Sequence, residues 1–153
     1  MITIRLSARE DVLDLQNLNN EVFIDNAKYD SDLDLAWAKG EKGKASFMEL
    51  LSDPRSLCLV AEDGKKKIGY LAAGPKEIDY RKRRYFEIHS MGVIPAYRSK
   101  GIGRLLLEKC FEWAKAEGYQ SIFVNAYIKN DRAVDFYKDA GFSEIDISLE
   151  RPL

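Results

Sequence analysis

Apolar and polar positions alternate at the start of the chain and then change to helical spacing. Residues 2–6 alternate and include β-branched side chains, which is typical of a strand. Residues 7–11 provide the turn and N-cap chemistry that precedes a helix. Apolar side chains then recur three positions apart, at Val12, Leu15 and Leu18. The first elements predicted are therefore a strand and a helix.

The periodic pattern weakens over residues 19–46, where aspartate, asparagine and glycine interrupt it. Such punctuation indicates a loop with short helical pieces. The loop holds four aspartates that could attract a cationic amine, although a solvated, mobile loop is the plainer interpretation. They are Asp25, Asp30, Asp32 and Asp34. A short helix is expected over residues 47–51, and it ends before Pro54.

Three strands follow, and the first two form a hairpin. Residues 57–61 and 68–73 are strand segments, and the Asp63-Gly64 pair between them is a strong hairpin turn signal. A basic connector, residues 81–84, leads into a strand over Tyr85–Val93 that ends at Pro95. Strict alternation in this strand would place two sets of side chains on opposite faces. These sets are Glu87, His89, Met91 and Val93, and Phe86, Ile88 and Ser90.

Helix and strand patterns alternate in the last third of the chain. A long amphipathic helix is predicted from Gly101 to about Glu117, with Gly118 as its C-terminal cap. A strand over residues 121–127 and a short helix over residues 131–140 follow, and a last strand has alternating Ile145, Ile147 and Leu149. Because hairpin-linked strands come first and helix-crossover strands later, the predicted fold class is α/β. In detail, we expect a mixed α+β sheet, mostly antiparallel and flanked by helices, in a single domain over residues 1–153.

Composition narrows the function classes. The 24 lysines and arginines nearly cancel the 25 aspartates and glutamates, so the charge balance predicts neither a nucleic-acid partner nor a membrane surface. Two cysteines, Cys58 and Cys110, both in apolar stretches, favour a reduced protein over a disulfide framework. No leader pattern or membrane-spanning apolar run is present, so a cytoplasmic protein is expected.

A glycine-bearing turn between a strand and an amphipathic helix is the sharpest chemical signal. Backbone N–H groups at a helix start have no intrahelical partner and carry partial positive charge, so they suit an anion. Glycines there let a diphosphate approach the backbone, and flanking basic residues add charge. The turn consists of Arg98, Ser99, Lys100, Gly101, Ile102, Gly103 and Arg104. Its spacing fits neither a P-loop nor a dinucleotide fingerprint, and an ordinary helix start with solvated basic residues is the alternative interpretation.

Two segments carry a family resemblance. Residues 91–106 resemble motif A of the GNAT acetyltransferases, whose core is Arg/Gln-x-x-Gly-x-Gly/Ala. Residues 130–142 resemble motif B, of the form Asn-x-x-Ala-x-x-x-Tyr-x-x-x-Gly-Phe. Both occur in the family's order and spacing, and the resemblance extends over essentially the whole chain. It implies the GNAT acyl-CoA N-acyltransferase fold and an acetyl-CoA-dependent N-acetyltransferase, but it does not specify the substrate.

The resemblance also implies where acetyl-CoA binds. The backbone of the turn, Arg98 to Arg104, would hold the pyrophosphate, and the pantetheine arm would pair with Met91, Gly92 and Val93. Asn130 of motif B would touch the arm, and Tyr137 would point at the cofactor sulfur. Many members of the family are dimers, so a homodimer is compatible with the resemblance.

Transfer to an amine sets three chemical requirements. An alkylammonium with a pKa of about 10.4 must lose a proton, the thioester carbonyl must be polarised, and the thiolate that leaves must be stabilised. Tyr137 is the candidate acid. Glu87 is the candidate base by its resemblance to the family's glutamate, and His89, the only histidine, is the alternative to Glu87 or to water. Glu87-x-His89 is too sparse for a metal site, so none is expected.

Several functional alternatives stay open at this point. The acceptor is a protein N-terminus, a lysine or a small amine, and the acyl group is acetyl or a longer one. A non-catalytic CoA-binding regulatory module would keep the glycine turn and lose Tyr137 and Glu87. A nucleic-acid-binding domain would use the basic connector, against the near-zero net charge. Neither cysteine has an evident activating partner, so direct attack by the amine is expected rather than a covalent acyl-enzyme.

Overall fold

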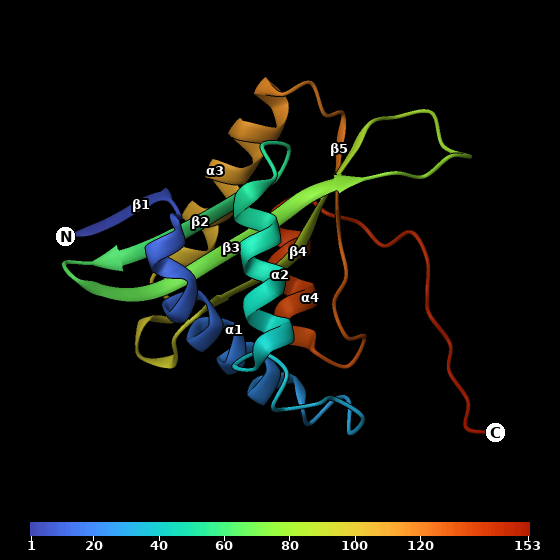
Figure 1. Ribbon diagram of the computed structural model, residues 1–153. Coiled ribbons are helices and arrows are strands. Elements are labelled where there is room, and N and C mark those ends of the chain that lie inside the picture. The colour runs from blue at the N-terminus through green and yellow to red at the C-terminus, as the bar shows by residue number, and fades with distance from the viewer.

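One five-stranded sheet forms the centre of the molecule (Figure 1). The computed structural model describes all 153 residues. The strands lie in chain order across the sheet, and they are β1 (Ile2–Leu6), β2 (Leu57–Asp63), β3 (Lys66–Lys76), β4 (Tyr85–Val93) and β5 (Ser121–Val124). The first four are antiparallel neighbours, and β5 pairs with β4 in parallel. The predicted mixed, mostly antiparallel sheet is confirmed.

Helices cover both faces of this sheet. The longer elements are α1 (Val12–Asn26), α2 (Glu41–Ser52), α3 (Ile102–Ala116) and α4 (Asp131–Asp139), with 3-10 turns at Arg9–Asp11 and Pro95–Tyr97. Side chains of α1 and α2 share one buried cluster with Cys58, Tyr70 and Ala72 of the sheet. Side chains of α3 share a second, larger cluster with the opposite face, and Phe136 and Tyr137 of α4 pack against it. The two helix pairs therefore lie on opposite faces of the sheet.

Helices α1 and α2 are longer than the pattern predicted. The sequence indicated a loop over residues 19–46, whereas α1 continues to Asn26 and α2 begins at Glu41. Gly43 is a loop signal in the sequence but lies inside α2, where a Cβ would come within 2.3 Å of the Ala38 carbonyl oxygen. The glycine therefore serves close packing in the helix and does not mark a loop. The aromatic ring of Phe23 stacks on Trp37 at a centroid distance of 5.7 Å and ties the intervening loop to α1. Tertiary packing thus extends both helices through residues that usually interrupt a helix.

The predicted last strand is absent. Ile145, Ile147 and Leu149 lie in an extended segment that pairs with no strand, and they are 57%, 63% and 87% exposed. Strand β5 is also shorter than predicted, because it ends at Val124 rather than at Tyr127. Alternation marks a segment that fits a pleated sheet, but a strand forms only where a neighbour supplies the hydrogen bonds.

A β-bulge in β4 corrects the predicted arrangement of its side chains. Ala72 of β3 pairs with Ser90, and the next residue, Ala73, pairs with Ile88, so that His89 is an extra residue in β4. One extra residue moves every later side chain to the other face. Met91 and Val93 therefore lie with Ile88 on the face of the sheet that α3 covers. Glu87, Ser90 and Gly92 lie on the other face, which α1 and α2 cover. The prediction that Glu87 shares a face with Met91 and Val93 is wrong.

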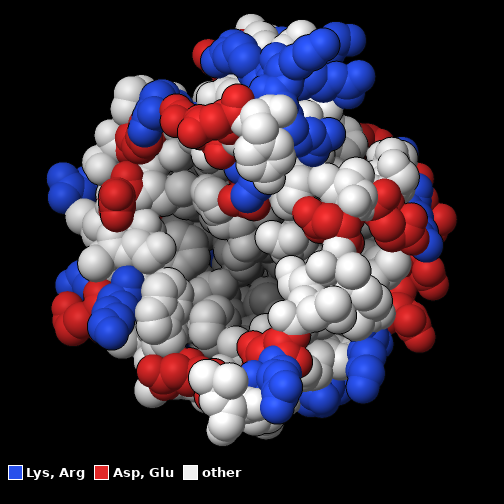
Figure 2. All heavy atoms as spheres, turned by 90° about the vertical axis from the view of Figure 1, so that its right-hand side faces the viewer, with Lys and Arg blue, Asp and Glu red and all other residues white.

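Strands β4 and β5 separate just beyond this bulge. Their pairing runs only from Tyr85 opposite Ser121 to Ile88 opposite Val124. From residue 89 to residue 93 the edge of β4 that faces β5 therefore has no partner strand. Figure 2 looks at the molecule from the β5 side of Figure 1 and shows a deep hollow with mostly uncharged walls and charges of both signs around its rim.

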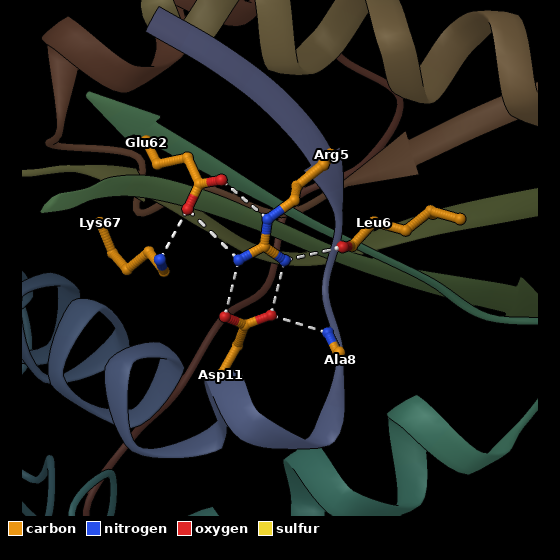
Figure 3. A network of polar contacts seen from close by, with 6 residues as sticks. All are labelled: Arg5, Leu6, Ala8, Asp11, Glu62 and Lys67. Atoms are coloured by element: carbon orange, nitrogen blue, oxygen red, sulfur yellow. Dashed lines mark hydrogen bonds and ion pairs between the residues drawn. The ribbon is translucent and has the colours of Figure 1, made fainter. Parts of the chain in front are cut away.

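An ion network joins β1, β2 and the start of α1 (Figure 3). The Arg5 guanidinium donates two hydrogen bonds to Asp11, at 2.8 and 2.9 Å, and two to Glu62, at 2.8 and 3.2 Å. Lys67 donates to Glu62 at 2.6 Å, and the Ala8 amide donates to Asp11 at 2.8 Å. The hydrogen bond from Arg5 lowers the pKa of Asp11 from its ordinary value. The ionised form of Asp11 therefore stabilises the folded state.

Asp11→Asn is expected to lower the free energy of unfolding by about 1.5–3 kcal/mol at pH 7, because it removes a charged acceptor that is 7% exposed. The partial exposure of Arg5 favours the lower end of that range. Since the pKa of Asp11 is lowered in the fold, its contribution is full above its unfolded value of roughly 3.9 and is lost as the pH falls through the lowered value. Urea unfolding at several pH values measures both effects, and Asp14→Asn on the same helix turn is the control. A pH-independent difference would contradict the ionic explanation.

Candidate active site

The glycine turn between β4 and α3 presents an unbroken series of free backbone donors. Helix α3 begins after Gly101, which has a φ of 81°, and Ser99 has a φ of 61°. These left-handed conformations turn the chain so that the helix start is open. None of the successive N–H groups from Ser99 to Arg104 donates to a backbone acceptor. A row of free N–H groups at a helix N-terminus is suited to a phosphate group.

The basic side chains of the turn already have partners within the protein. Arg98 donates to the Val93 carbonyl at 2.9 Å and pairs with Asp25 at the end of α1. Arg104 pairs with Glu108 at 3.1 Å and also donates to a carbonyl of α4. The Lys100 ammonium lies 5.2 Å from the centre of the Tyr97 ring and has no carboxylate partner. Arg98 and Arg104 therefore hold the turn in place, and Lys100 is the least neutralised cation of the three.

The two glycines of the turn are required for different physical reasons. A Cβ on Gly101 would meet nothing within 4 Å, so its requirement comes from its positive φ. A Cβ on Gly103 would lie 3.1 Å from the Phe136 ring of α4. Gly103 therefore permits α4 to pack against α3, a role that spacing in the sequence did not indicate. The same contact places motif B beside the glycine turn.

The free edge of β4 lies next to this turn. The Met91 side chain is half-buried, and its methyl carbon is 3.9 Å from the position of a Cβ on Gly103. Gly92 has no room for a side chain, because a Cβ there would come within 2.6 Å of Val22 on α1. Met91, Gly92 and Val93 thus present backbone along the gap between β4 and β5, beside the free N–H groups of the turn.

Glu87 and His89 lie close together on either side of Ile88. Glu87 is 18% exposed, and its carboxylate is 3.0 Å from the Lys76 ammonium and 3.5 Å from Nδ1 of His89. Gly74 makes room for the His89 ring, since a Cβ on Gly74 would lie 3.0 Å from Nε2. The bulge brings His89 out of the sheet beside Glu87 instead of leaving it two positions along a regular face. The structure therefore brings both candidate bases together.

Tyr137 is held by aromatic neighbours while its hydroxyl stays free. Its ring makes edge contacts with Phe136 and Phe142 at centroid distances of 5.3 and 5.6 Å. Burial raises its pKa to about 12. With this pKa the phenol is fully protonated at neutral pH. Because the neighbouring rings are apolar, its hydroxyl is available as a hydrogen-bond donor.

Asn130 is the N-cap of α4. Its side-chain oxygen accepts a hydrogen bond from the Ala133 amide at 3.1 Å. This use leaves the amide nitrogen of the side chain free to donate. Asn130 therefore both starts the helix that carries Tyr137 and keeps one polar group available.

Sequence reasoning missed two groups of polar contacts between segments that are far apart in the chain. The Asn19 amide of α1 donates to Tyr70 at 2.8 Å and to Ser90 at 3.2 Å, and the Tyr70 and Ser90 hydroxyls bond to each other beside the bulge. The Tyr127 hydroxyl donates to Asp30 at 2.6 Å, which raises the pKa of Tyr127 to about 12. Nothing in the local pattern links residues so far apart in sequence. Two of the four loop aspartates, Asp25 and Asp30, thus have partners within the protein, and the side chain of Asp25 is still 45% exposed.

The cysteines lie on opposite faces of the sheet. Cys58 belongs to the cluster beneath α1 and α2, and Cys110 belongs to the cluster beneath α3. Burial raises the pKa of Cys58 to about 11 and that of Cys110 to about 12. A thiol with a raised pKa and no cationic neighbour is a weak nucleophile. The prediction that neither cysteine is activated agrees with this geometry.

Two further features of the structure concern metals and membranes. No three histidine, cysteine, aspartate or glutamate side chains come together in a group that could hold a metal ion. None of the helices combines the length and the apolar character that crossing a membrane requires.

Comparisons with known proteins agree with this geometry. The Acetyltransferase (GNAT) family matches residues 12–142. An uncharacterized N-acetyltransferase from Methanocaldococcus jannaschii is 29% identical over 95% of this chain, and the N-alpha-acetyltransferase RimI from Mycobacterium tuberculosis is 29% identical over 67% of it. The matched part is 62% of the length of each relative. A solved structure from Pyrococcus furiosus, described as a putative acetyl transferase, has a TM-score of 0.81 at 23% identity, with 100% of both chains covered, which shows the shared fold. The chain belongs to the acetyltransferase (GNAT) family.

Proposed function

We propose that this protein transfers the acetyl group of acetyl-CoA to a primary amine by direct attack of the amine on the thioester. The observation that carries the proposal is the row of free N–H groups from Ser99 to Arg104 beside the free edge of β4. A diphosphate on the turn and an extended amide-bearing arm along β4 would use both. The family membership and the names of the relatives support an acyltransferase.

The proposed cofactor contacts come from three segments. The pyrophosphate would accept from the backbone of the turn: Arg98, Ser99, Lys100, Gly101, Ile102, Gly103 and Arg104. The pantetheine amides would pair with Met91, Gly92 and Val93, because these residues have no partner strand on that edge. The free amide nitrogen of Asn130 would donate to the arm. We take acetyl as the acyl group on the basis of the family.

The amine must be neutral to attack, so a base that accepts its proton is required. Glu87 is the proposed base, acting directly or through a water molecule. Lys76 holds one carboxylate oxygen at 3.0 Å, and the other faces His89. The attacking nitrogen forms a C–N bond, the C–S bond breaks, and the products are an amide and a thiol.

Tyr137 is proposed to stabilise the sulfur as the C–S bond breaks. Its pKa of about 12 is above the roughly 8.5 of an ordinary thiol, so full proton transfer to the thiolate is unfavourable. A hydrogen bond from the phenol to the developing thiolate has no such cost. Within the proposal, Tyr137 therefore acts as a hydrogen-bond donor, and the proton that completes the thiol comes from the attacking nitrogen, which loses it as the amide forms, or from water.

The proposal is tested by following CoA release from acetyl-CoA with a panel of amines that includes peptide N-termini, lysine peptides, polyamines and aminoglycosides. Glu87→Gln is expected to lower kcat by about 10- to 100-fold near pH 7. The difference in kcat between the variant and the parent should become smaller as the pH approaches the pKa of an alkylammonium, roughly 10.4, because the amine then loses its proton to solvent.

Glu77→Gln is the matched control, because it removes the same charge from an exposed position in the loop after β3. An equal loss in both variants, or a Glu87→Gln deficit that does not change with pH, would contradict the role as base. Acetyl-CoA binding without turnover of any amine would instead favour a non-catalytic CoA-binding module.

A further inference from the structure

A cavity at the base of the loop between β3 and β4 has an excess of positive charge. Its volume is about 380 Å³, which lies within the range of small-molecule sites. Figure 2 shows a dense group of lysine and arginine side chains above the hollow, at the height where Figure 1 shows this loop. The charged lining consists of five cations, Arg55, Lys76, Arg81, Arg83 and Arg84, and two carboxylates, Glu77 and Asp79. Five cations against two carboxylates leave three positive charges in excess, although the whole chain has a formal net charge of −1.

Only two of the five cations form ion pairs. Arg55 pairs with Asp53 at 2.9 Å, and Lys76 pairs with Glu87 at 3.0 Å. The other three arginines have no carboxylate partner, and the two carboxylates of the lining pair with none of the cations. Like charges that are held close together without counterions repel one another. An anion in the cavity would therefore relieve this repulsion.

The three unpaired arginines are positioned by contacts that leave most of their donors free. Arg81 lies over the Tyr85 ring at 4.7 Å from its centre, and Arg84 lies over the Tyr119 ring at 4.6 Å. Arg84 also donates to a backbone carbonyl after α3 at 3.1 Å, and Arg83 donates to a hydroxyl at the start of β5 at 3.2 Å. Each hydrogen bond uses one of the five N–H groups of a guanidinium. The remaining N–H groups are available to a ligand.

The cations reach the cavity from separate parts of the chain. Arg55 precedes β2, Lys76 ends β3, and the three unpaired arginines precede β4. Donors that approach from several directions suit the tetrahedral oxygens of a phosphate, whereas a carboxylate accepts within one plane. A phosphate monoester carries nearly two negative charges near neutral pH, so two phosphate groups match the excess of three. A confined volume suits a small ligand, whereas a nucleic-acid strand requires an extended groove.

We propose that this cavity is a binding site for a small anion that carries a diphosphate or two phosphate groups. The site is separate from the glycine turn. Tyr85, the first residue of β4, lines the cavity, and the turn follows Val93, the last residue. The nine residues of β4 thus place the two sites roughly 25 Å apart. Lys76 lines the cavity and also holds the carboxylate of Glu87, so a bound anion would share this cation with the candidate base.

Titration calorimetry with inorganic pyrophosphate tests the proposal. In about 0.15 M salt, where loose attraction between exposed charges is largely screened, one saturable cavity site with a dissociation constant below about 1 mM is expected. The double variant Arg81→Gln, Arg83→Gln should weaken binding at that site at least about 30-fold, because each substitution removes a charged donor. Lys42→Gln, Lys44→Gln is the matched control, since it removes the same charge from exposed positions of α2 and should bind like the parent. All these positions are exposed, so circular dichroism should not differ among the three proteins.

The Gly101→Asp variant separates the cavity from the glycine turn. A diphosphate held on the turn would be repelled by the new carboxylate. Binding in the cavity should change less than about twofold, because the distance between the two sites exceeds the Debye length. Pyrophosphate that responds to Gly101→Asp and not to the arginine substitutions would be bound on the turn, and that result would overturn the proposal.

The only histidine of the chain reports where the anion binds. Nδ1 of His89 lies 3.5 Å from the Glu87 carboxylate, whose other oxygen is held by Lys76. An anion that shares Lys76 should therefore shift the NMR resonances of this imidazole as it saturates the site. Binding heat without such a shift, or no saturable binding at all, would overturn the proposal.

Two further ligands test the kind of anion. Citrate carries about three negative charges but has no phosphate group, so it should bind at least about tenfold more weakly than pyrophosphate. Equal binding of citrate would overturn the preference for phosphate. A single-stranded RNA that binds more tightly than pyrophosphate and depends on the same arginines would identify a nucleic-acid surface, and it would overturn the proposal of a small-ligand site.

Discussion

Gly101→Asp is expected to weaken acetyl-CoA binding by about 30-fold or more, whereas Gly101→Asn should weaken it only a few-fold. The position has a φ of 81°, which both Asn and Asp tolerate better than other side chains do, and a Cβ there meets nothing within 4 Å. The two variants therefore differ chiefly in charge. A carboxylate a few ångströms from a diphosphate costs roughly 2 kcal/mol at an intermediate dielectric constant, and that corresponds to about 30-fold.

Titration calorimetry with acetyl-CoA measures this difference, and thermal unfolding of both variants verifies that they fold alike. Equal weakening by Asn and Asp would mean that backbone strain, not charge, is responsible. Unchanged binding in both would mean that the turn does not hold the diphosphate. Gly103 is unsuitable for this test, because a side chain there would collide with Phe136 and disturb the packing of α4.

Tyr137→Phe is expected to lower kcat by about 100-fold while the dissociation constant of acetyl-CoA changes less than about twofold. The phenylalanine ring keeps the edge contacts with Phe136 and Phe142, so the variant removes only the hydroxyl. Loss of one donor aimed at developing charge has an effect of this size. Because burial raises the pKa of Tyr137 to about 12, the phenol stays protonated from pH 6 to 10, and the ratio of the two rates should be constant over that range.

Tyr127→Phe is the control for this experiment. Tyr127 also has a pKa raised to about 12, but the cause is its hydrogen bond to Asp30, and the hydroxyl is already committed there. Its removal should leave kcat within a few-fold of the parent value. Comparable losses in both variants, or a Tyr137 effect that varies with pH across that range, would contradict the proposed role of Tyr137. Steady-state rates of CoA release provide the measurement.

Local signals in the sequence predicted most of the elements and the candidate cofactor turn. The predicted hairpin formed, with Gly64 at a φ of 59°, although its turn residues are Gly64 and Lys65, because Asp63 is the last residue of β2 and pairs with Lys66. Strand β4 begins and ends where its pattern predicted, and Gly118 and Gly141 follow helices α3 and α4 in left-handed conformations. Each of these features depends on residues that are neighbours in the chain, so a short window of sequence contains the physical cause.

Contacts between segments far apart in the chain determined the arrangements that the local pattern did not predict. Arg98 pairs with Asp25, and Gly103 meets Phe136. The bulge at His89 depends on the register with β3, and it reverses the faces on which Met91 and Val93 lie. None of these partners can be inferred from spacing along a single chain, since each depends on how the helices dock on the sheet.

The sequence by itself determined the order of elements as far as α4, the family and the turn suited to a diphosphate, because periodicity, motif spacing and glycine positions are local properties. Only the tertiary structure decided which side chains meet at the site and whether a strand-like segment becomes a strand. Residues 145–149 illustrate the difference. Their alternation is a property of the chain, but a strand forms only beside another strand, and none of the five strands pairs with them. The fold thus places Glu87 beside His89 and Tyr137 among apolar rings, arrangements that depend on long-range packing.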